Sequence, residues 1–168
     1  VEFGQVRVAD TQGSVGRPMF MADNFTVWLS VGALLSGAIE AKDIELRKPT
    51  VTLVLDEKGG GNWASLSPES FRGRFVPARV AFDSVRIADG TLSIVGPDGT
   101  AKTKFENIDG ELSAQALEGP YRLVATFLRS GARREFRLST ARAADDGAVH
   151  FKGTVRDPAS GVSYSLEG

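Results

Sequence analysis

Apolar and polar residues alternate along most of this 168-residue chain, and this alternation limits its fold more than any other feature. A period of two places apolar side chains on one face of a β-strand and polar side chains on the other. Turn sequences such as Gly96–Gly99 separate the alternating segments. We therefore expect ten to twelve short strands. The clearest alternating segments are residues 6–8, 44–47, 51–55, 85–87, 92–94, 112–114, 123–127, 136–138 and 149–151.

The predicted fold class is mostly β, a curled antiparallel meander that is taco-like or sandwich-like, with one or two short helices. The helix signals are Val31–Leu35, which Gly37 follows, and Ser67–Phe71. We expect a single β-rich domain over residues 1–168, with a candidate sub-boundary at 66–78, where the alternation lapses. Because the chain lacks an initiator methionine and stops in a strand-like pattern, we expect it to be a fragment of a longer protein.

Composition excludes several classes of function. The absence of cysteine excludes disulfides and cysteine-based zinc sites, and the one histidine, His150, excludes a histidine-rich metal site. Lysine and arginine total 20 against 21 acidic residues, so the chain lacks the basic excess of a general nucleic-acid binder. The longest uncharged segment, residues 24–39, is too short to span a bilayer.

The sequence offers no catalytic constellation. Gly59–Gly61 is followed by Asn62 and Trp63 rather than by the Lys-Ser/Thr pair of a phosphate-binding loop. No Gly-x-Ser-x-Gly nucleophile motif occurs. Most of the carboxylates considered precede strands or turns, which favours a structural role: Asp43, Asp83, Asp89 and Asp109. We therefore expect a non-enzymatic protein without a metal or a cofactor.

The apolar face of so many strands must be covered, because exposed apolar surface costs about 25 cal/mol per Å². The few predicted helices are too short to cover it. Either the sheet closes on itself as a sandwich or barrel, or an apolar ligand such as an acyl chain fills a trough. Both arrangements require the same alternation, so the pattern does not separate them.

A degenerate repeat relates two parts of the chain at a constant offset of 41 residues. Each unit has a strand, a break at proline or glycine, and a second strand. Two units are fewer than the three or more that a repeat architecture usually has. The matched positions are Ile44, Leu46, Pro49, Val51 and Leu53 in the first unit, and Val85, Ile87, Gly90, Leu92 and Ile94 in the second.

Arginines gather around one predicted hairpin near the C-terminal third of the chain. A solvated strand face is one interpretation, and contact with an anionic headgroup or a protein partner is another. Interleaved aromatic residues, which nucleic-acid binding would favour, are missing. The cluster consists of Arg129, Arg133, Arg134, Arg137 and Arg142.

Several segments together resemble the N-terminal module of the AsmA family of Gram-negative envelope proteins. The similarity covers roughly residues 1–66 and 80–118, and only the strand pattern continues beyond them. The segments that carry it are Asn24–Gly37, Ile39–Leu46, the Pro49-x-Val51-x-Leu53 strand, Gly61-Asn62-Trp63, Val85–Leu92 and Asn107–Leu112.

The resemblance implies a periplasmic domain of a protein that is anchored in the inner membrane by a helix outside this chain. It also implies an apolar trough, like that of bridge-like lipid-transfer proteins, that shields phospholipid acyl chains during transport between the membranes and maintenance of the outer membrane. The family shares no catalytic residues. Pro49 and Gly90 would break the strands so that the sheet bends. Adding the opening strand, we expect the trough to be lined by Val6, Val8, Ile44, Leu46, Val51, Leu53, Val85, Ile87, Leu92 and Ile94.

A second hypothesis is a closed β-sandwich that acts as a scaffold for envelope assembly. Its contacts would be exposed sheet edges or the arginine hairpin. An unpaired edge strand would also allow association between copies of the chain.

Overall fold

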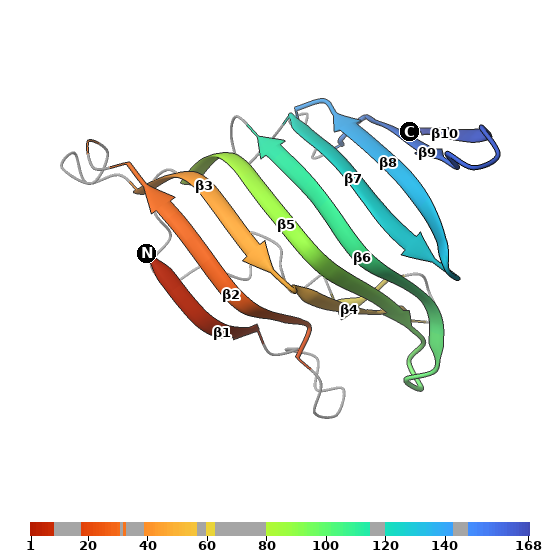
Figure 1. Ribbon diagram of the computed structural model, residues 1–168, viewed down its shortest axis with the longest axis horizontal. Helices are drawn as coiled ribbons and strands as arrows, with labels where there is room; N and C mark the ends of the chain where they lie inside the picture. The colour runs from red at the N-terminus through yellow and green to blue at the C-terminus, as the bar shows by residue number, and fades with distance from the viewer. Residues whose placement is uncertain are drawn as a thin grey trace.

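The computed structural model describes residues 1–8, 18–30, 32, 39–56, 60–62, 80–114, 120–142 and 148–168. Within these residues, ten strands form one sheet (Figure 1), which confirms the predicted mostly-β fold and the strand count. The strands are β1 (Glu2–Val8), β2 (Phe20–Leu29), β3 (Ile39–Arg47), β4 (Thr50–Val54), β5 (Val80–Val95), β6 (Ala101–Ala114), β7 (Tyr121–Arg129), β8 (Ala132–Thr140), β9 (Phe151–Arg156) and β10 (Ser163–Glu167). The helices predicted at 31–35 and 67–71 and the sub-boundary at 66–78 fall outside the described residues, apart from Gly32.

The strand order is β1-β2-β3-β5-β6-β7-β8-β9-β10, and β4 lies between β2 and β5. Neighbours are antiparallel, as predicted, except that β3 and β4 both pair with β5 in parallel, which the predicted antiparallel meander did not include. The physical reason is the long segment 55–79 between β4 and β5, because a parallel pair needs a connection far longer than a hairpin.

The parallel pairing explains the 41-residue repeat. Ile44 pairs with Val85 and Leu46 with Ile87, and beyond the break Val51 pairs with Leu92. The two matched units therefore lie side by side in register, with equivalent residues as neighbours. The repeat is a property of two adjacent strand units, each with one break, and not of separate stacked modules.

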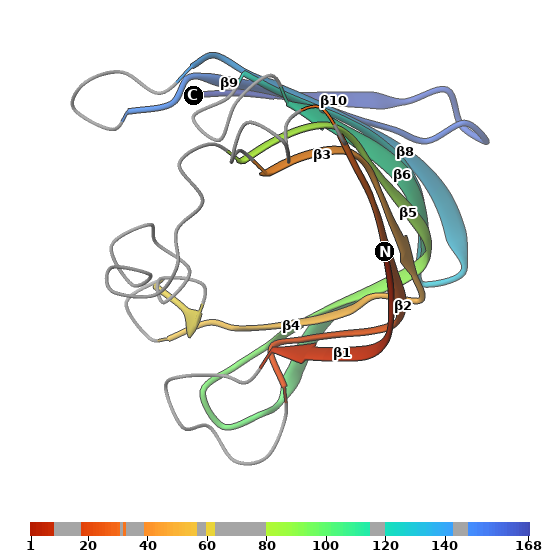
Figure 2. The same cartoon turned by 90° about the vertical axis from the view of Figure 1, so that its left-hand side faces the viewer.

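The sheet bends sharply along one line that crosses its first strands, as Figure 2 shows. Lys48, Asp89 and Asn107 lie on this line and have positive φ values of 48°, 56° and 47°, and Gln5 of β1 has φ 52°. The left-handed backbone conformation is unfavourable for residues with a side chain, although less so for asparagine and aspartate. Its recurrence on neighbouring strands marks a bend that is built into the sheet.

Hydrogen bonds hold the bend together from strand to strand. The Lys48 N–H donates to Ala88 O at 2.8 Å, and the Thr91 N–H donates to Pro49 O at 2.8 Å. On the other side of β5, Asn107 Nδ2 donates to Asp89 Oδ1 at 3.1 Å. The pairing between neighbouring strands thus continues through the bend.

Gly90 identifies the inner side of the bend. A Cβ atom at Gly90 would lie 3.0 Å from Cγ2 of Ile87 and 3.3 Å from Cβ of Ile108. Positions three residues apart in a straight strand lie about 10 Å apart. The close approach of Ile87 to Gly90 therefore places the Ile87 side chain on the concave side, which we call the inner face.

The edge of β4 that lies away from β5 is closed by two other segments. Met19 O accepts a hydrogen bond from the Thr52 N–H at 2.8 Å. The Asn62 side chain then takes the place of a neighbouring strand: its Oδ1 accepts from the Val54 N–H at 3.1 Å, and its Nδ2 donates to Thr52 O at 3.0 Å. Asn62 is buried at 3% exposure, so these bonds are shielded from water.

The sheet has little conventional core. Among the described residues, no large side chain is fully buried, and most of the buried apolar residues are small alanines. The described strands form a single layer, with no second sheet packed against it.

Candidate functional site

The inner face carries two continuous apolar rows that run across the strands. Residues directly opposite each other on neighbouring strands share a face, so the registers define each row. The Leu46 row is Phe3, Phe25, Leu46, Ile87, Gly110, Ala125, Phe136, Val155 and Tyr164. The Ile44 row is Val27, Ile44, Val85, Leu112, Leu123, Leu138, Gly153 and Leu166.

The outer face has the opposite character. On each strand, one residue lies between the members of the two apolar rows, and these residues form a row on the outer face. This row is polar at every position but one, and charges of both signs alternate along part of it. Its members are Thr26, Glu45, Arg86, Glu111, Val124, Arg137, Thr154 and Ser165. The sheet is therefore amphipathic across its full width.

All ten residues predicted to line a trough belong to the inner face. Four are in the two rows above the bend, and below it Val51 pairs with Leu92 and Leu53 with Ile94. Val8 of β1 lies opposite Phe20, which lies opposite Val51. Nine of the ten are half-buried, and Val8 is exposed.

The apolar positions change parity at the bend. Leu46 and Val51 are five residues apart, as are Ile87 and Leu92, whereas residues on one face of an unbroken strand are separated by an even number. The edge-to-face contact between Phe105 and Phe127, with ring centroids 5.1 Å apart, connects β6 and β7 beside the bend. The inner face thus stays apolar above and below the bend.

Sequence reasoning missed the continuation of the inner face into β7–β10. The residues concerned include Leu123, Leu138, Phe136, Val155 and Tyr164. The alternation was visible in residues 123–127 and 136–138, but the family resemblance ends near residue 118. The period of two alone would have extended the candidate face.

The motif residues predicted to shape the turns occupy the bend and the β4 edge. Pro49 lies between β3 and β4, and Gly90 lies beside the bend in β5. Gly61 forms an isolated bridge with Leu55, and Asn62 closes the β4 edge. Trp63 lies outside the described residues.

The structure does not keep the arginine cluster together. Arg129 and Arg134 lie on the inner face, whereas Arg133 donates from Nη2 to Thr126 Oγ1 at 3.1 Å on the outer face, where Arg137 also lies. The arginines that gather in sequence therefore do not form one patch, because adjacent residues of a strand point to opposite faces. Arg142 is exposed beyond the end of β8.

Two cations that sequence reasoning missed lie beside Arg137 on the outer face. Arg122 and Lys152 line the same shallow depression, of about 420 Å³, next to the exposed Val124. Lys152 Nζ is 2.7 Å from Glu167 Oε1, and this contact raises the pKa of Lys152 and lowers that of Glu167. The cations Arg122, Arg137 and Lys152 come from three strands, so only the sheet brings them together.

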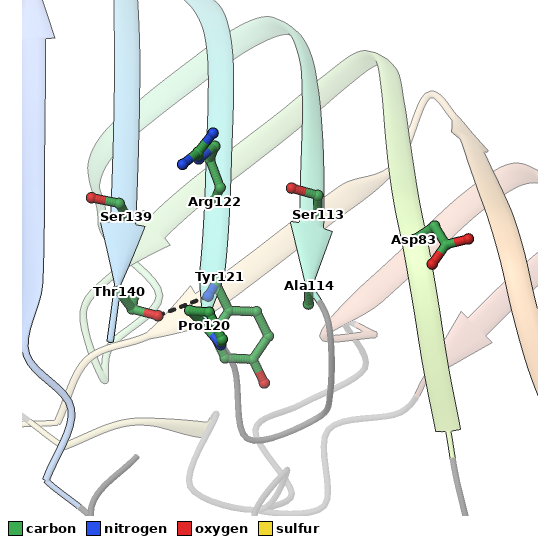
Figure 3. Close-up of a pocket in the computed structure, with 8 residues that line it drawn as sticks. All are labelled: Asp83, Ser113, Ala114, Pro120, Tyr121, Arg122, Ser139 and Thr140. Carbon is green, nitrogen blue, oxygen red and sulfur yellow. Dashed lines mark hydrogen bonds between the residues drawn. The ribbon is translucent and has the colours of Figure 1, made fainter. Parts of the chain in front are cut away.

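A second depression, of about 370 Å³, lies at the ends of β6, β7 and β8 (Figure 3). Thr140 Oγ1 accepts a hydrogen bond from the Tyr121 N–H there at 2.9 Å. The lining holds one carboxylate and no histidine, so it provides neither a carboxylate pair nor a serine–histidine pair. Its residues are Asp83, Ser113, Ala114, Pro120, Tyr121, Arg122, Ser139 and Thr140.

Two of the candidate carboxylates, Asp89 and Asp109, accept hydrogen bonds at the bend. Asp109 Oδ1 accepts from the Asp89 N–H at 3.0 Å, which supports the bend. Asp43 lies opposite Trp28 on β2 and Ser84 on β5. Within the described part of the chain, no group of three or more acidic or histidine residues is placed to hold a metal ion.

No protein-family model matches the chain, and no curated protein matches it significantly. None of the described residues belongs to a helix long and apolar enough to cross a membrane. The inner face is therefore the strongest candidate site, on the basis of its own geometry.

Proposed function

We propose that this protein is a non-enzymatic lipid-handling domain whose inner face shields acyl chains. The observation that carries the proposal is the pair of uncharged rows across eight and nine strands, with no second layer of the described residues over them. At about 4.8 Å between strands, the longer row extends for about 38 Å. Apolar surface of this extent favours an apolar occupant, because its exposure to water is thermodynamically unfavourable.

The resemblance to AsmA-like proteins gives this proposal its biological setting. The domain would be the N-terminal periplasmic part of a protein anchored in the inner membrane through a segment outside this chain. Its task would be to shield phospholipids during transport between the two membranes. The repeat, the strand breaks and the inner face are the features that support this setting.

Native mass spectrometry of gently purified protein tests the proposal, with two adjacent residues as a matched pair. Leu123 is on the inner face and Val124 is on the outer face, where it is 48% exposed. We expect co-purified lipid in the wild type and in Val124→Glu, and little or none in Leu123→Glu. Circular dichroism establishes that both variants keep their strands.

If the wild type carries no lipid and takes none up after delipidation, the lipid proposal is wrong. The scaffold hypothesis then becomes the better one, and a specific observation favours it. Within the described residues β10 pairs only with β9, and its Tyr164 and Leu166 are 66% and 58% exposed. Size-exclusion chromatography of a Tyr164→Lys variant would show whether this edge drives association.

A further inference from the structure

The first charged side chains beside the apolar rows of the inner face are found at the β7–β8 hairpin. Arg134 lies directly opposite Phe127, which follows the Leu46 row by two residues on β7. Arg129 lies a further two residues along β7. The two apolar rows themselves contain no charged residue. Positive charge is therefore placed at one border of an apolar surface.

Arg134 is already neutralised. Its Nη1 lies 3.2 Å from Asp157 Oδ2 and also donates to Arg133 O at 2.9 Å. Desolvation opposes ionisation of Asp157, but hydrogen bonds from Ser160 and Ala159 and the charge of Arg134 together lower its pKa. Asp157 is thus a carboxylate at neutral pH, and the pair carries no net charge.

Arg129 is not neutralised in this way. Its guanidinium carbon lies 5.9 Å from the centroid of the Phe105 ring, in a cation–π contact. Among the described residues, its guanidinium forms neither an ion pair nor a hydrogen bond. A contact of the cation with a ring face uses none of the five N–H donors of the guanidinium in a hydrogen bond.

The aromatic pair fixes where this cation is placed. Phe105 belongs to β6 below the bend, Phe127 lies on β7 opposite the bend residues of β6, and their rings meet edge to face at 89°. Arg129 is the last residue of β7, at the β7–β8 hairpin, and lies over a ring of the bent strand β6. An amphiphile on the inner face would have an anion-binding group at this border.

We propose that Arg129 recognises the acidic headgroup of an amphiphile whose acyl chains lie on the inner face. This inference rests on the proposed lipid-binding function and narrows its ligand class to acidic lipids. A guanidinium binds phosphate or carboxylate oxygens in a bidentate manner, and a nearby apolar surface strengthens the attraction by lowering the local dielectric. Neutral lipids would gain only the apolar contact.

The test compares two fluorescent lipids with identical acyl chains, phosphatidylglycerol and diacylglycerol, on the delipidated full chain. We expect phosphatidylglycerol to bind about tenfold more tightly, as one charge-assisted contact allows. Arg129→Gln should remove this preference and leave diacylglycerol binding unchanged. Arg129→Lys should restore it in part, because lysine keeps the charge but not the bidentate geometry.

Arg133→Gln is the matched control, since Arg133 lies on the same hairpin but on the outer face. It should keep the preference for phosphatidylglycerol. An equal loss of this preference in the Arg133→Gln and Arg129→Gln variants would overturn the inference, because the net charge of the protein would then explain the preference.

Three further outcomes are informative. Equal affinity of the wild type for the two lipids overturns the role of Arg129 and leaves the proposed function standing. Absence of binding to either lipid overturns both. Displacement of phosphatidylglycerol by millimolar inorganic phosphate would assign Arg129 to a free-phosphate site and overturn headgroup recognition, whereas no displacement supports it.

Discussion

The two ends of the sheet carry the same apolar rows but expose them very differently. Leu46 and Ile87, in the bent half, are half-buried, whereas Tyr164, at the far end of their row, is 66% exposed. Leu166 is likewise far more exposed than Ile44 and Val85 in its own row. Phe3, in the edge strand β1 of the bent half, is also 50% exposed, so the position of a strand at the sheet edge, together with the curvature, decides how much of the apolar face water reaches.

The bent half owes its shape to a few residues. Positive φ values recur inside or between its strands, whereas in the described part of β7–β10 they occur only in turns, at Ser130, Gly131 and Gly161. Figure 1 shows the long, curved β5 and β6 beside the straighter β9 and β10. The comparison therefore predicts that variants at the bend affect stability most and that variants at the open end affect it least.

Gly90→Val should have the largest effect. The new side chain would collide with Ile87 and Ile108 at the inner side of the bend, and overpacking of this kind costs about 2–3 kcal/mol. Urea unfolding measures the loss. Gly4→Val is the control, because a Cβ there meets nothing within 4 Å. Equal effects of the two variants would mean that the bend does not depend on the close approach at Gly90.

Asn62→Ala should destabilise the protein by about 2 kcal/mol, since it leaves the buried edge groups of Thr52 and Val54 without their partner. The control is Asn24→Ala, whose Nδ2 donates to Glu2 Oε1 at 2.7 Å on an exposed surface. We expect thermal unfolding to show a clear shift for Asn62→Ala only. A shift of similar size in both variants would contradict the role of Asn62 as a substitute strand.

Leu112→Ala and Leu166→Ala compare the two halves within one row. We expect a loss of about 1.5 kcal/mol for the half-buried Leu112 and less than about 0.5 kcal/mol for the exposed Leu166. Denaturant unfolding of the delipidated protein measures both. If the two losses are equal, the exposure difference does not govern stability. Bound lipid should reduce the difference between the two stability losses, because it would also cover Leu166.

The smallest effect concerns the Lys152–Glu167 pair at the open end. Hydrogen bonding to Lys152 lowers the pKa of Glu167, so the pair stabilises the β9–β10 contact above the ordinary glutamate pKa and is lost as pH falls through the lowered one. NMR titration of the Glu167 carboxyl checks this. Its pKa should rise toward the ordinary value in Lys152→Met, and an unchanged titration would show that the pair is too exposed to matter.

Much of the candidate face followed from the sequence, because strand alternation is a local property. All ten predicted residues proved to share one face, and the 41-residue offset equals the register of β3 and β4 with β5. Alternation also implied that Arg133 and Arg134 point to opposite faces, although their clustering in sequence suggested one patch. The contact of Arg129 with Phe105 was beyond such reasoning, because 24 residues and the bend separate the two.

The sequence by itself determined that the chain is built of amphipathic strands and where those strands break, at Pro49 and Gly90. These outcomes depend on neighbouring residues, backbone preferences and a period of two. Only the tertiary structure decided that β3 and β4 lie parallel to β5, that the rows join across nine strands and that Arg129 lies over the Phe105 ring beside them. Such outcomes depend on which strands become neighbours, and long-range pairing, unlike alternation, leaves little trace in a local pattern.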